Sequence, residues 1–561
     1  MTHTKYATLA TCCASACLAL SSGCSTTAAT GNTGLAGADA TGGTDTTVEQ
    51  DAAPPDVRLQ AWVYASDPVT DGKTTQVTLP QPTDPNGMLT GAFVQVSNCL
   101  PEDGGAEMKQ GGYTFGHLCH EVQTAAPNAN GDGSYLDIVP PQDTADMGDT
   151  FAEVQMYYHV NQIHDFFSNG FDLHDLDFPL YALVNVTYAT MMNGNNFEGF
   201  PNAAFMPKEA FAQFGLPGRD QGAIVFGQYQ STDFCYDASV IYHEYTHAIV
   251  GTTRLNGVTM DAYGMDNLPS AMNEGFADYF SCSKRNSPII GPYALSFAGD
   301  WLVRDLTLAR KCPDDLTTEV HADGKIIGSA MWELRGVLGQ EVADGIILKA
   351  LEQFSQQTNM DAAAKLILAE AKKVDADTGN ATQTVLKNHG MLGCVRAREW
   401  ASFAVDSSSD KVGYTLTSPS ALGGNSASTF PTGLPGYVQF WLEAPAAGKV
   451  AVLSVSASSQ GGGMGGGGKA GVNFAIRKGK AVQLNMLSGG APLSDGTASP
   501  KVTNKGTYSQ QFALVGTCFT AGSKTYVMML NNSQSDAQVE TMDVQWLDAV
   551  PTGMTSVDCV K

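Results

Sequence analysis

The sequence predicts an α+β fold with a β-rich lobe, a helical lobe after it, and a β-sandwich at its C-terminal end. Apolar and polar residues alternate in short segments before about residue 230, as in half-buried strands. Between about residues 240 and 374 apolar residues recur at helical spacing. Beyond about residue 405, strand-like segments return, joined by turns rich in Gly, Ser and Asn.

Composition and charge limit the classes of partner. The 561 residues are enough for about three domains, and 43% of them are hydrophobic while only 16% are charged. The formal net charge of −25 argues against nucleic acid as a partner and favours a soluble, exported protein. Nothing in the sequence sets the oligomeric state.

The N-terminus has the pattern of an export signal. Lys5 precedes a short apolar run over residues 7–20, too short for a permanent membrane span. The segment ending in Cys24 resembles a bacterial lipoprotein signal, although its leucine lies one position further from the cysteine than usual. We therefore expect residues 1–24 to be a signal peptide, with a lipid on Cys24 that attaches the protein to the outer membrane or cell surface. The alternative is an ordinary cleaved signal and a secreted protein.

Residues 25–56 contain no Lys or Arg and few large apolar side chains, so we expect a disordered tether.

Eight cysteines follow residue 24, and an even number in an exported protein indicates up to four disulfides. Proximity in the sequence favours the pairs Cys99–Cys119 and Cys518–Cys559. The pairing of the other four stays open: Cys235, Cys282, Cys312 and Cys394.

The predicted domains follow from the order of the elements. Residues 57–145 form a β-rich N-terminal region, residues 146–405 the central domain, and residues 406–561 a β-sandwich whose role could be binding or folding support. A long helix is expected from Thr150, where Thr150 and Glu153 form a plausible capping box. His159 and His164, on that helix, are expected to be core or surface residues. Further helices are expected over residues 301–310, 325–338 and 345–374.

The pair of histidines in His243-Glu244-Tyr245-Thr246-His247 indicates a metal. Residues four apart on a helix differ by about 40° in direction, so both rings face one point and can bind one Zn²⁺. Glu244 lies beside the first ring, where a carboxylate can act on water. Glu274 is the natural third ligand. Asp278, four residues further on the same helical face, is placed to accept a hydrogen bond from a ligating histidine.

The alternative for this motif is a solvated helix with His and Glu at its surface. The flanking residues Val240, Ile241, Ile249 and Val250 indicate a buried helix instead, where unpaired His and Glu side chains are costly. A structural zinc site would need four protein ligands. Three ligands and a base are found here, which favours a catalytic site.

The strings HEYTH and NEGFADYF resemble the gluzincin metalloendopeptidases, above all the fungalysin family, with the thermolysin family as its cousin. YYHVNQIHDF from Tyr157, VHADGKI from Val320 and the segment Asn202–Phe205 support the resemblance, which covers roughly residues 150–400. It implies a thermolysin-like two-lobed domain that hydrolyses peptide bonds in proteins.

Site residues follow from the resemblance position by position. It implies that His243, His247 and Glu274 bind Zn²⁺, that Glu244 is the general base and that Asp278 orients His243. His321 would stabilise the developing oxyanion; its alternative role is at a capped helix start. Arg304 would hold the carbonyl beyond the scissile bond; its alternative is an ion pair with a nearby aspartate. The strand with Ala203 and Ala204 would pair with an extended peptide.

The sequence departs from the family pattern at several positions. Ala203 stands where thermolysin-like enzymes have a substrate-binding asparagine. Tyr263 is the nearest candidate for a second oxyanion donor, but its offset from Glu274 differs. Ser239 replaces a calcium-binding aspartate, so a Ca²⁺ site is not predicted. Residues 57–145 leave no room for the large fungalysin propeptide. The competing functions are a surface-anchored binding or adhesion module with a structural or inactive zinc site, and an exopeptidase, for which no amine-recognising string is found.

Overall fold

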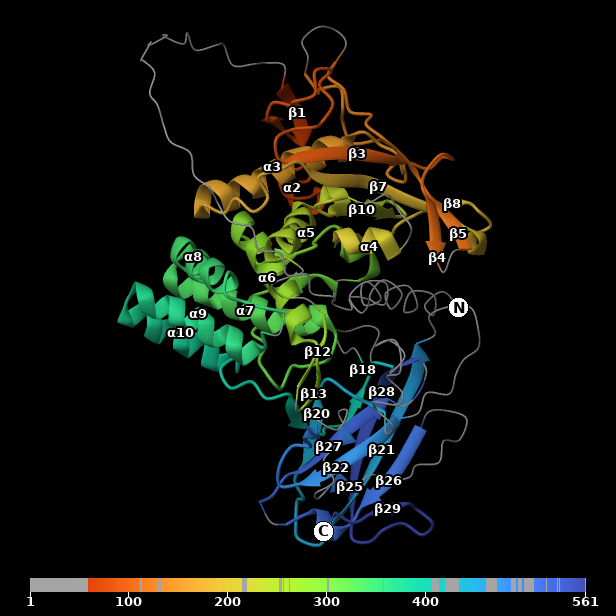
Figure 1. Ribbon diagram of the computed structural model, residues 1–561, viewed down its shortest axis with the longest axis vertical. Helices are drawn as coiled ribbons and strands as arrows, with labels where there is room; N and C mark the ends of the chain where they lie inside the picture. Colours follow the sequence, from red (N-terminus) through yellow and green to blue (C-terminus); the bar gives the residue numbers. More distant parts are fainter. Residues whose placement is uncertain are drawn as a thin grey trace, which may run out of the picture.

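The computed structural model describes residues 59–559, except 111–112, 129–133, 214–218, 252–254, 256, 262, 300–301, 357, 406–412, 419–432, 461–471, 486–490, 493–496, 499–508, 521, 532 and 534. Residues 1–24, the tether at 25–56 and Cys24 lie outside the described residues. Figure 1 shows a nine-stranded sheet at one end of the molecule, a pair of sheets at the other, and helices between them.

The nine-stranded sheet supplies the strand that borders the site. Its central order is β11-β10-β7-β3-β6, with β3 and β10 both parallel to β7, and β9 added antiparallel to β10. The strands predicted around residues 181–186 and 222–227 are β7 and β10. The bounds are β3 (Val94–Leu100), β4 (Glu107–Gln110), β5 (Tyr113–Leu118), β6 (His120–Val122), β7 (Leu180–Thr190), β8 (Phe197–Gly199), β9 (Ala203–Met206), β10 (Ala223–Tyr229) and β11 (Thr232–Asp233).

Strands β3–β6 belong to the region predicted to precede the central domain, yet they pair with β7 in the same sheet. A small hairpin of β1 (Gln60–Val63) and β2 (Thr75–Thr78) and the turn of helix α2 (Pro68–Asp71) precede them. The long helix α3 (Phe151–Phe171) packs on β3 and β7, and α4 (Lys208–Gln213) follows β9.

The capping box predicted at the start of α3 is wrong. Thr150 makes no side-chain cap hydrogen bond. The carboxylate of Glu153 instead accepts hydrogen bonds from the N–H groups of Thr124 and Ala125. A tertiary partner has displaced the local one, because Glu153 is fully buried and its charge needs several donors.

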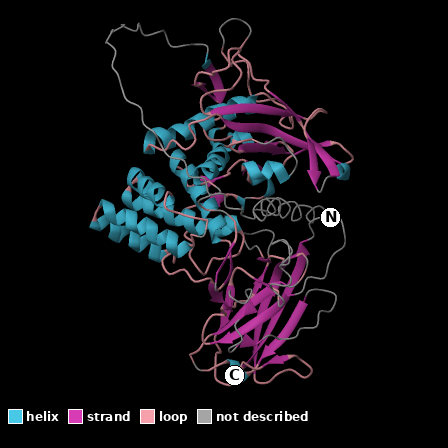
Figure 2. Cartoon of the chain, viewed as in Figure 1, coloured by secondary structure: helices cyan, strands magenta, loops and turns pink. Residues whose placement is uncertain are grey.

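Helices lie between the nine-stranded sheet and the pair of sheets at the other end of the molecule (Figure 2). They are α5 (Ala238–Val250), α6 (Leu268–Arg285), α7 (Val320–Leu338), α8 (Gln340–Leu351), α9 (Met360–Val374) and α10 (Ala376–Asn388). Asp237 caps α5 by accepting from the N–H of Ser239, and Gly251 ends it at a φ of 69°. Between α5 and α6 lies a hairpin of β12 (Thr259–Asp261) and β13 (Gly264–Asp266).

The helix predicted over residues 301–310 is wrong. The described part of this segment forms β15 (Arg304–Asp305), which pairs with β14 (Ile289–Ile290), followed by turns. Helix α7 also begins earlier than predicted, because the Glu319 side chain accepts from the N–H groups of His321 and Ala322. Short 3-10 turns occur at η2 (Met191–Asn193), η3 (Phe234–Tyr236), η4 (Ser296–Ala298) and η8 (Gly516–Cys518).

The C-terminal strands form two six-stranded sheets, called here the C-terminal sheets. The ring centroids of Phe474 and Phe512, one from each sheet, lie 4.7 Å apart, so the two sheets share buried side chains. One sheet holds β16 (Ala397–Glu399), β19 (Leu434–Pro435), β20 (Gln439–Leu442), β22 (Val472–Lys478), β25 (Thr497–Ala498) and β27 (Thr525–Asn531). The other holds β17 (Phe403–Ala404), β18 (Tyr414–Leu416), β21 (Val450–Gln460), β26 (Ser509–Leu514), β28 (Asp536–Leu547) and β29 (Ser556–Val557), and β23 (Leu484–Asn485) pairs with β24 (Ala491–Pro492).

Disulfides close three loops. The predicted pairs Cys99–Cys119 and Cys518–Cys559 are confirmed, and Cys312–Cys394 is a third. Cys235 and Cys282 are buried free thiols. Of the four disulfides that the sequence allows, three are therefore formed among the described residues.

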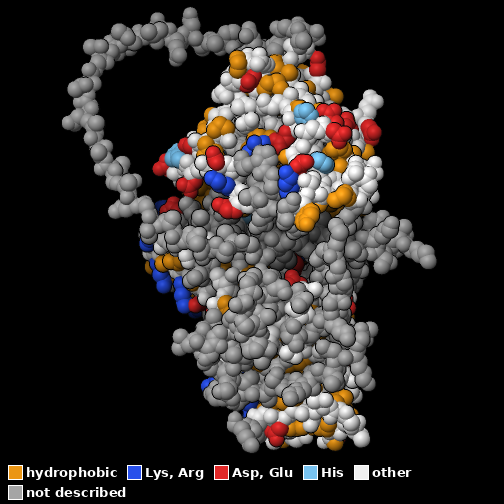
Figure 3. Space-filling model, turned by 45° about the vertical axis from the view of Figure 1, so that its right-hand side comes forward, with side chains coloured by type: hydrophobic (Ala, Val, Ile, Leu, Met, Phe, Trp, Pro, Cys, Tyr) orange, Lys and Arg blue, Asp and Glu red, His pale blue; other side chains and the backbone are white. Residues whose placement is uncertain are grey.

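On the face in Figure 3, acidic, basic and hydrophobic side chains are interspersed over the upper part. None of the helices described here is both long and apolar enough to cross a membrane.

Candidate metal centre

Two adjacent helices bring His243, His247 and Glu274 together. The two histidines lie one turn apart on α5 and their Nε2 atoms are 3.0 Å apart. Glu274 on α6 places Oε2 at 3.2 Å from Nε2 of His243 and 3.5 Å from Nε2 of His247. Metal-binding side chains in proteins are mainly those of His, Cys, Asp and Glu. Among the described residues, this is the one group of three or more of them whose ligand atoms all lie within 4.8 Å of one another.

The outer ring nitrogens of both histidines face oxygen atoms. Nδ1 of His247 lies 2.8 Å from Oδ1 of Asn273, and Nδ1 of His243 lies 2.9 Å from Oδ1 of Asp278. The contact between His243 and Asp278 is close enough for an ion pair, but Nδ1 of His243 does not form a well-aligned hydrogen bond. Because these oxygens can only accept, each Nδ1 carries a proton, which leaves each Nε2 as the ring nitrogen that can bind a cation in place of a proton.

Sequence reasoning missed the role of Asn273. Its side-chain N–H₂ donates to the carbonyl of Leu255 at 2.8 Å, which turns its oxygen toward His247. The signal was present, since Asn273 directly precedes the expected ligand Glu274 on α6. Only the packing of α6 on α5 shows which histidine it serves.

The donor set fits a divalent cation. Oε2 of Glu274 is buried and has no hydrogen-bond partner, although three histidine Nε2 atoms lie within 3.5 Å of it. Burial raises the pKa of Glu274, but His321 and His247 outweigh burial and hold the pKa well below its usual range. Burial likewise lowers the pKa of His247, but Glu274 raises it to about 9. A buried carboxylate with two imidazoles, and no well-aligned donor for its oxygen, suits Zn²⁺.

Glu244 is held between the metal centre and a strand edge. Its Oε2 accepts a hydrogen bond of 2.7 Å from the N–H of Phe205 on β9. Backbone groups alternate in direction along a strand, so the N–H and C=O of Ala203 also face the Glu244 side, while those of Ala204 face β10. The site therefore lies against the outer edge of β9.

His321 reaches the site from the start of α7. Its Nδ1 lies 2.7 Å from Oε1 of Glu319, and its Nε2 lies 3.4 Å from Oε2 of Glu274. Burial lowers the pKa of His321, but Glu274 and Glu319 together raise it to about 9. A protonated His321 carries an N–H on the site side of its ring.

Arg304 contacts Asp278 rather than open solvent. Its Nε and Nη2 donate to Oδ1 of Asp278 at 3.1 and 2.8 Å. Burial raises the pKa of Asp278, but Arg304 and His243 outweigh it and lower the pKa below its usual value. One carboxylate thus joins Arg304 to the ring of His243, so the ion pair weighed for Arg304 exists.

Two further positions lie elsewhere. Tyr263 lies in the turn of the β12–β13 hairpin, with 37% of its side chain exposed. Ser239 donates to Asp237 at 2.5 Å and accepts from the N–H of Gly291 at 2.8 Å, within the fold behind α5.

Comparison with known proteins adds to this geometry. Residues 119–338 match the model of the fungalysin metallopeptidase family, M36. That range includes every site residue from Ala203 to His321. A solved structure of a family GH115 4-O-methyl-alpha-glucuronidase aligns over 55% of this chain and 38% of its own, with 10% identity and a TM-score of 0.12, too low to bear on the fold.

Three curated relatives are fungal. Extracellular metalloproteinase mep of Aspergillus niger is 28% identical over 31% of this chain and 27% of its own length. Extracellular metalloproteinase 4 of Trichophyton rubrum is 25% identical over 35% of this chain and 32% of its own length. Extracellular metalloproteinase 10 of Coccidioides posadasii is 25% identical over 32% of this chain and 31% of its own length. The chain therefore spans about a third or less of the length of these three relatives. The region from residue 119 to residue 338 is fungalysin-like.

Proposed function

We propose that this protein is an exported zinc endopeptidase. The observation that carries the proposal is the convergence of three donor atoms from α5 and α6 at a point flanked by Glu244, itself bonded to the edge of β9. Peptides commonly bind by adding a strand to such an edge. A carboxylate at that place can act on water beside a bound peptide bond.

His243, His247 and Glu274 are proposed to hold the zinc. When bound, zinc polarises the carbonyl of the substrate and makes water more acidic. Glu244 takes a proton from the attacking water and passes it to the leaving amine, as a general base and then a general acid. The hydrogen bond from Phe205 fixes one of its oxygens during this exchange.

Other residues are proposed to bind and orient the substrate. His321 donates from Nε2 to the oxyanion that develops on the carbonyl. Asp278 orients the ring of His243 and holds Arg304, whose remaining N–H groups bind the carbonyl beyond the scissile bond. An extended substrate pairs with the N–H and C=O of Ala203, and Ala204 sets the position of that strand against β10.

The arrangement of the chain is also a proposal. Residues 146–405 are proposed to form the thermolysin-like peptidase domain, whose sheet β3–β6 extend, and residues 406–561 a β-sandwich, whose sheets β16 and β17 join. The printed names of the relatives describe extracellular enzymes, which supports export of this chain. Residues 1–24 are proposed from the sequence pattern to be a lipoprotein-type signal, cleaved ahead of Cys24, which stays on the chain and carries the lipid.

The test is hydrolysis of casein by the purified protein without its signal. Activity that a chelator abolishes and added Zn²⁺ restores, with cleavage at internal bonds in the fragment masses, supports the proposal. Release of single terminal residues would point to an exopeptidase. A folded, zinc-loaded protein that cleaves no peptide would overturn the proposal and favour a binding module.

A further inference from the structure

We propose that the C-terminal sheets position two segments that lead to the candidate metal centre. Arg396 holds the β12–β13 hairpin, which precedes α6, and Arg398 holds residues 316–319, which precede His321. Both arginines lie outside the fungalysin-like region, at the start of the sheets. The proposal rests on the proposed peptidase function and extends it to residues outside that region.

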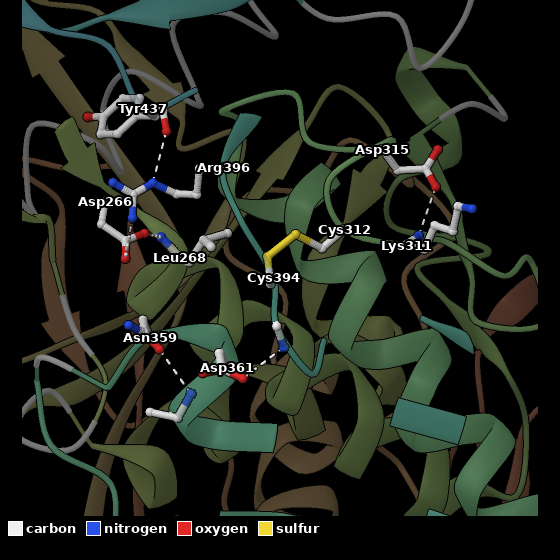
Figure 4. Close-up of a disulfide and its surroundings, with 12 residues drawn as sticks. Asp266, Leu268, Lys311, Cys312, Asp315, Asn359, Asp361, Cys394, Arg396 and Tyr437 are labelled. Atoms are coloured by element: carbon white, nitrogen blue, oxygen red, sulfur yellow. Dashed lines mark hydrogen bonds and ion pairs between the residues drawn. A yellow bond between two sulfur atoms is a disulfide. The ribbon is translucent and has the colours of Figure 1, made fainter. Parts of the chain in front are cut away.

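Arg396 joins the C-terminal sheets to the hairpin that precedes α6. Its guanidinium donates to both oxygens of Asp261 at 2.8 and 3.0 Å and lies 3.0 Å from Oδ2 of Asp266. Its Nε donates to the carbonyl of Tyr437 at 3.0 Å (Figure 4). Arg396 is only 7% exposed, so these charge-assisted hydrogen bonds are sheltered from water.

Asp266 passes this contact on to the metal-binding helix. Its Oδ1 accepts from the N–H of Leu268, the first residue of α6, at 3.0 Å. Figure 4 shows Asp266 between Arg396 and Leu268. The same helix carries Asn273 and the proposed ligand Glu274. A single residue, Asp266, therefore connects Arg396 to the start of this helix.

The hairpin itself packs into the C-terminal sheets. Met260 packs against a cluster of their buried side chains, and Gln439 donates from Nε2 to the carbonyl of Tyr263 at 3.0 Å. Gly264 has a φ of 126°, and a Cβ there would lie 2.7 Å from the carbonyl oxygen of Gly436. Only glycine permits this approach, so the sheets determine where the hairpin lies.

A second contact holds the segment that leads to His321. Arg398 on β16 donates from Nη1 to the carbonyl of Leu316 at 2.7 Å. The N–H of Thr415 on β18 donates to Oγ1 of Thr318 at 2.7 Å. From the other side, Asn267 donates to the carbonyl of Thr318 at 2.8 Å.

This segment ends in the groups that face the site. Thr318 has a φ of 78°, unfavourable for a β-branched residue, and is held there by contacts on both sides. Glu319 follows, caps α7 and binds Nδ1 of His321. If Arg398 is removed, the segment loses a contact on the sheet side only, and His321 shifts relative to Glu274.

The expected kinetic effect is specific. A small misplacement of a catalytic group can cost up to about 100-fold in rate. Arg398→Met keeps the length of the side chain and removes its donors. We expect kcat to fall about tenfold while KM stays within about twofold and zinc binding is complete.

A double-mutant cycle with His321→Ala separates positioning from general destabilisation. If Arg398 acts through His321, Arg398→Met causes no further loss of kcat in the His321→Ala background. Equal fold losses in both backgrounds, or an unchanged kcat in folded Arg398→Met, would overturn the proposal. Lys449→Met, which breaks an exposed ion pair with Asp548 beside the ends of β21 and β28, is the matched control and leaves kcat unchanged.

Amide hydrogen exchange tests the same inference without any substrate. Residues 316–322 exchange faster in Arg398→Met than in the wild type, and residues 259–261 and 263–266 exchange faster in Arg396→Lys. Unchanged exchange in both variants would overturn the proposal. If the wild type cleaves no peptide, the proposed function fails, and the exchange data still decide whether the sheets position these segments.

Discussion

The N–H of Phe205 donates a hydrogen bond of 2.7 Å to Oε2 of Glu244. This contact joins the edge of the nine-stranded sheet to α5, which carries two of the three candidate metal ligands. A peptide that pairs with β9 is therefore placed against Glu244 by the same strand that orients its carboxylate. In the proposed mechanism, substrate binding and proton transfer therefore share one structural element.

Glu244→Gln is expected to lower kcat by about 1,000-fold, within the range for loss of a general base. Glutamine has the same size and still accepts from Phe205, but its amide takes no proton at neutral pH. Zinc content stays at the wild-type level because Glu244 is not one of the proposed ligands. Steady-state peptide hydrolysis and metal analysis measure the two quantities.

Glu209→Gln, at an exposed position on α4, is the control for this substitution. It is expected to retain full activity. A loss of less than tenfold in Glu244→Gln would show that another group takes the proton.

Asn273→Ala is expected to weaken zinc binding by about 10- to 100-fold, the usual effect of removing a partner of a ligating histidine. The ring of His247 then loses the acceptor that keeps its proton on Nδ1. Competition with a chelator of known affinity measures the change. Asn169→Ala, at an exposed position on α3, should bind zinc as the wild type does; equal affinities for all three proteins would refute the orienting role of Asn273.

The grouping of the proposed metal ligands was largely predictable because these residues follow local rules. His243 and His247 are one helical turn apart, and Glu274 and Asp278 follow the same spacing on the next helix. Their convergence needs only that the two apolar helices pack together. The partners Asn273, Glu319 and Phe205 were not identified because their roles depend on how separate elements meet.

The wrong predictions show the same limit. Residues 301–310 have helical spacing, but Arg304 pairs with Ile290 as a short strand, and so its side chain reaches Asp278. Glu153 has capping-box spacing from Thr150, yet it binds Thr124 and Ala125. In each case a tertiary contact overrides a local preference. The contacts of Arg396 and Arg398 are equally invisible in the sequence.

The pH dependence of stability should reflect His159 on α3. Burial lowers its pKa to about 4, because a charged imidazolium loses its water inside the fold. The hydrogen bond between Nε2 and the carbonyl of Tyr64 raises the pKa but only partly offsets burial, and Nδ1 contacts the Tyr242 hydroxyl. The unfolded chain takes up a proton near pH 6.5, and the folded chain does so only near pH 4. The stabilisation is complete above pH 6.5 and is lost as the pH falls to about 4, by up to about 3 kcal/mol.

His159→Gln removes this titration while keeping a donor and an acceptor. Urea denaturation between pH 4 and 7 should therefore give a smaller loss of unfolding free energy for the variant than for the wild type. His117→Gln, at an exposed position on β5, should follow the wild type. Parallel curves for wild type and His159→Gln would contradict the assignment.

Removing the disulfide between Cys312 and Cys394 is expected to destabilise the protein by about 4 kcal/mol, because the bond closes a long loop in the unfolded chain. Its two cysteines are 82 positions apart, whereas Cys518 and Cys559 are 41 apart. Loop-closure entropy grows slowly, so the two losses should differ by only about 0.6 kcal/mol if entropy alone acts. The Cys312–Cys394 bond also ties the segment before Leu316 to the chain before Arg396. Double Cys→Ser variants, unfolded in urea, compare the two bonds; an excess loss well beyond that difference in Cys312→Ser/Cys394→Ser would show that this bond also holds native contacts around Arg396.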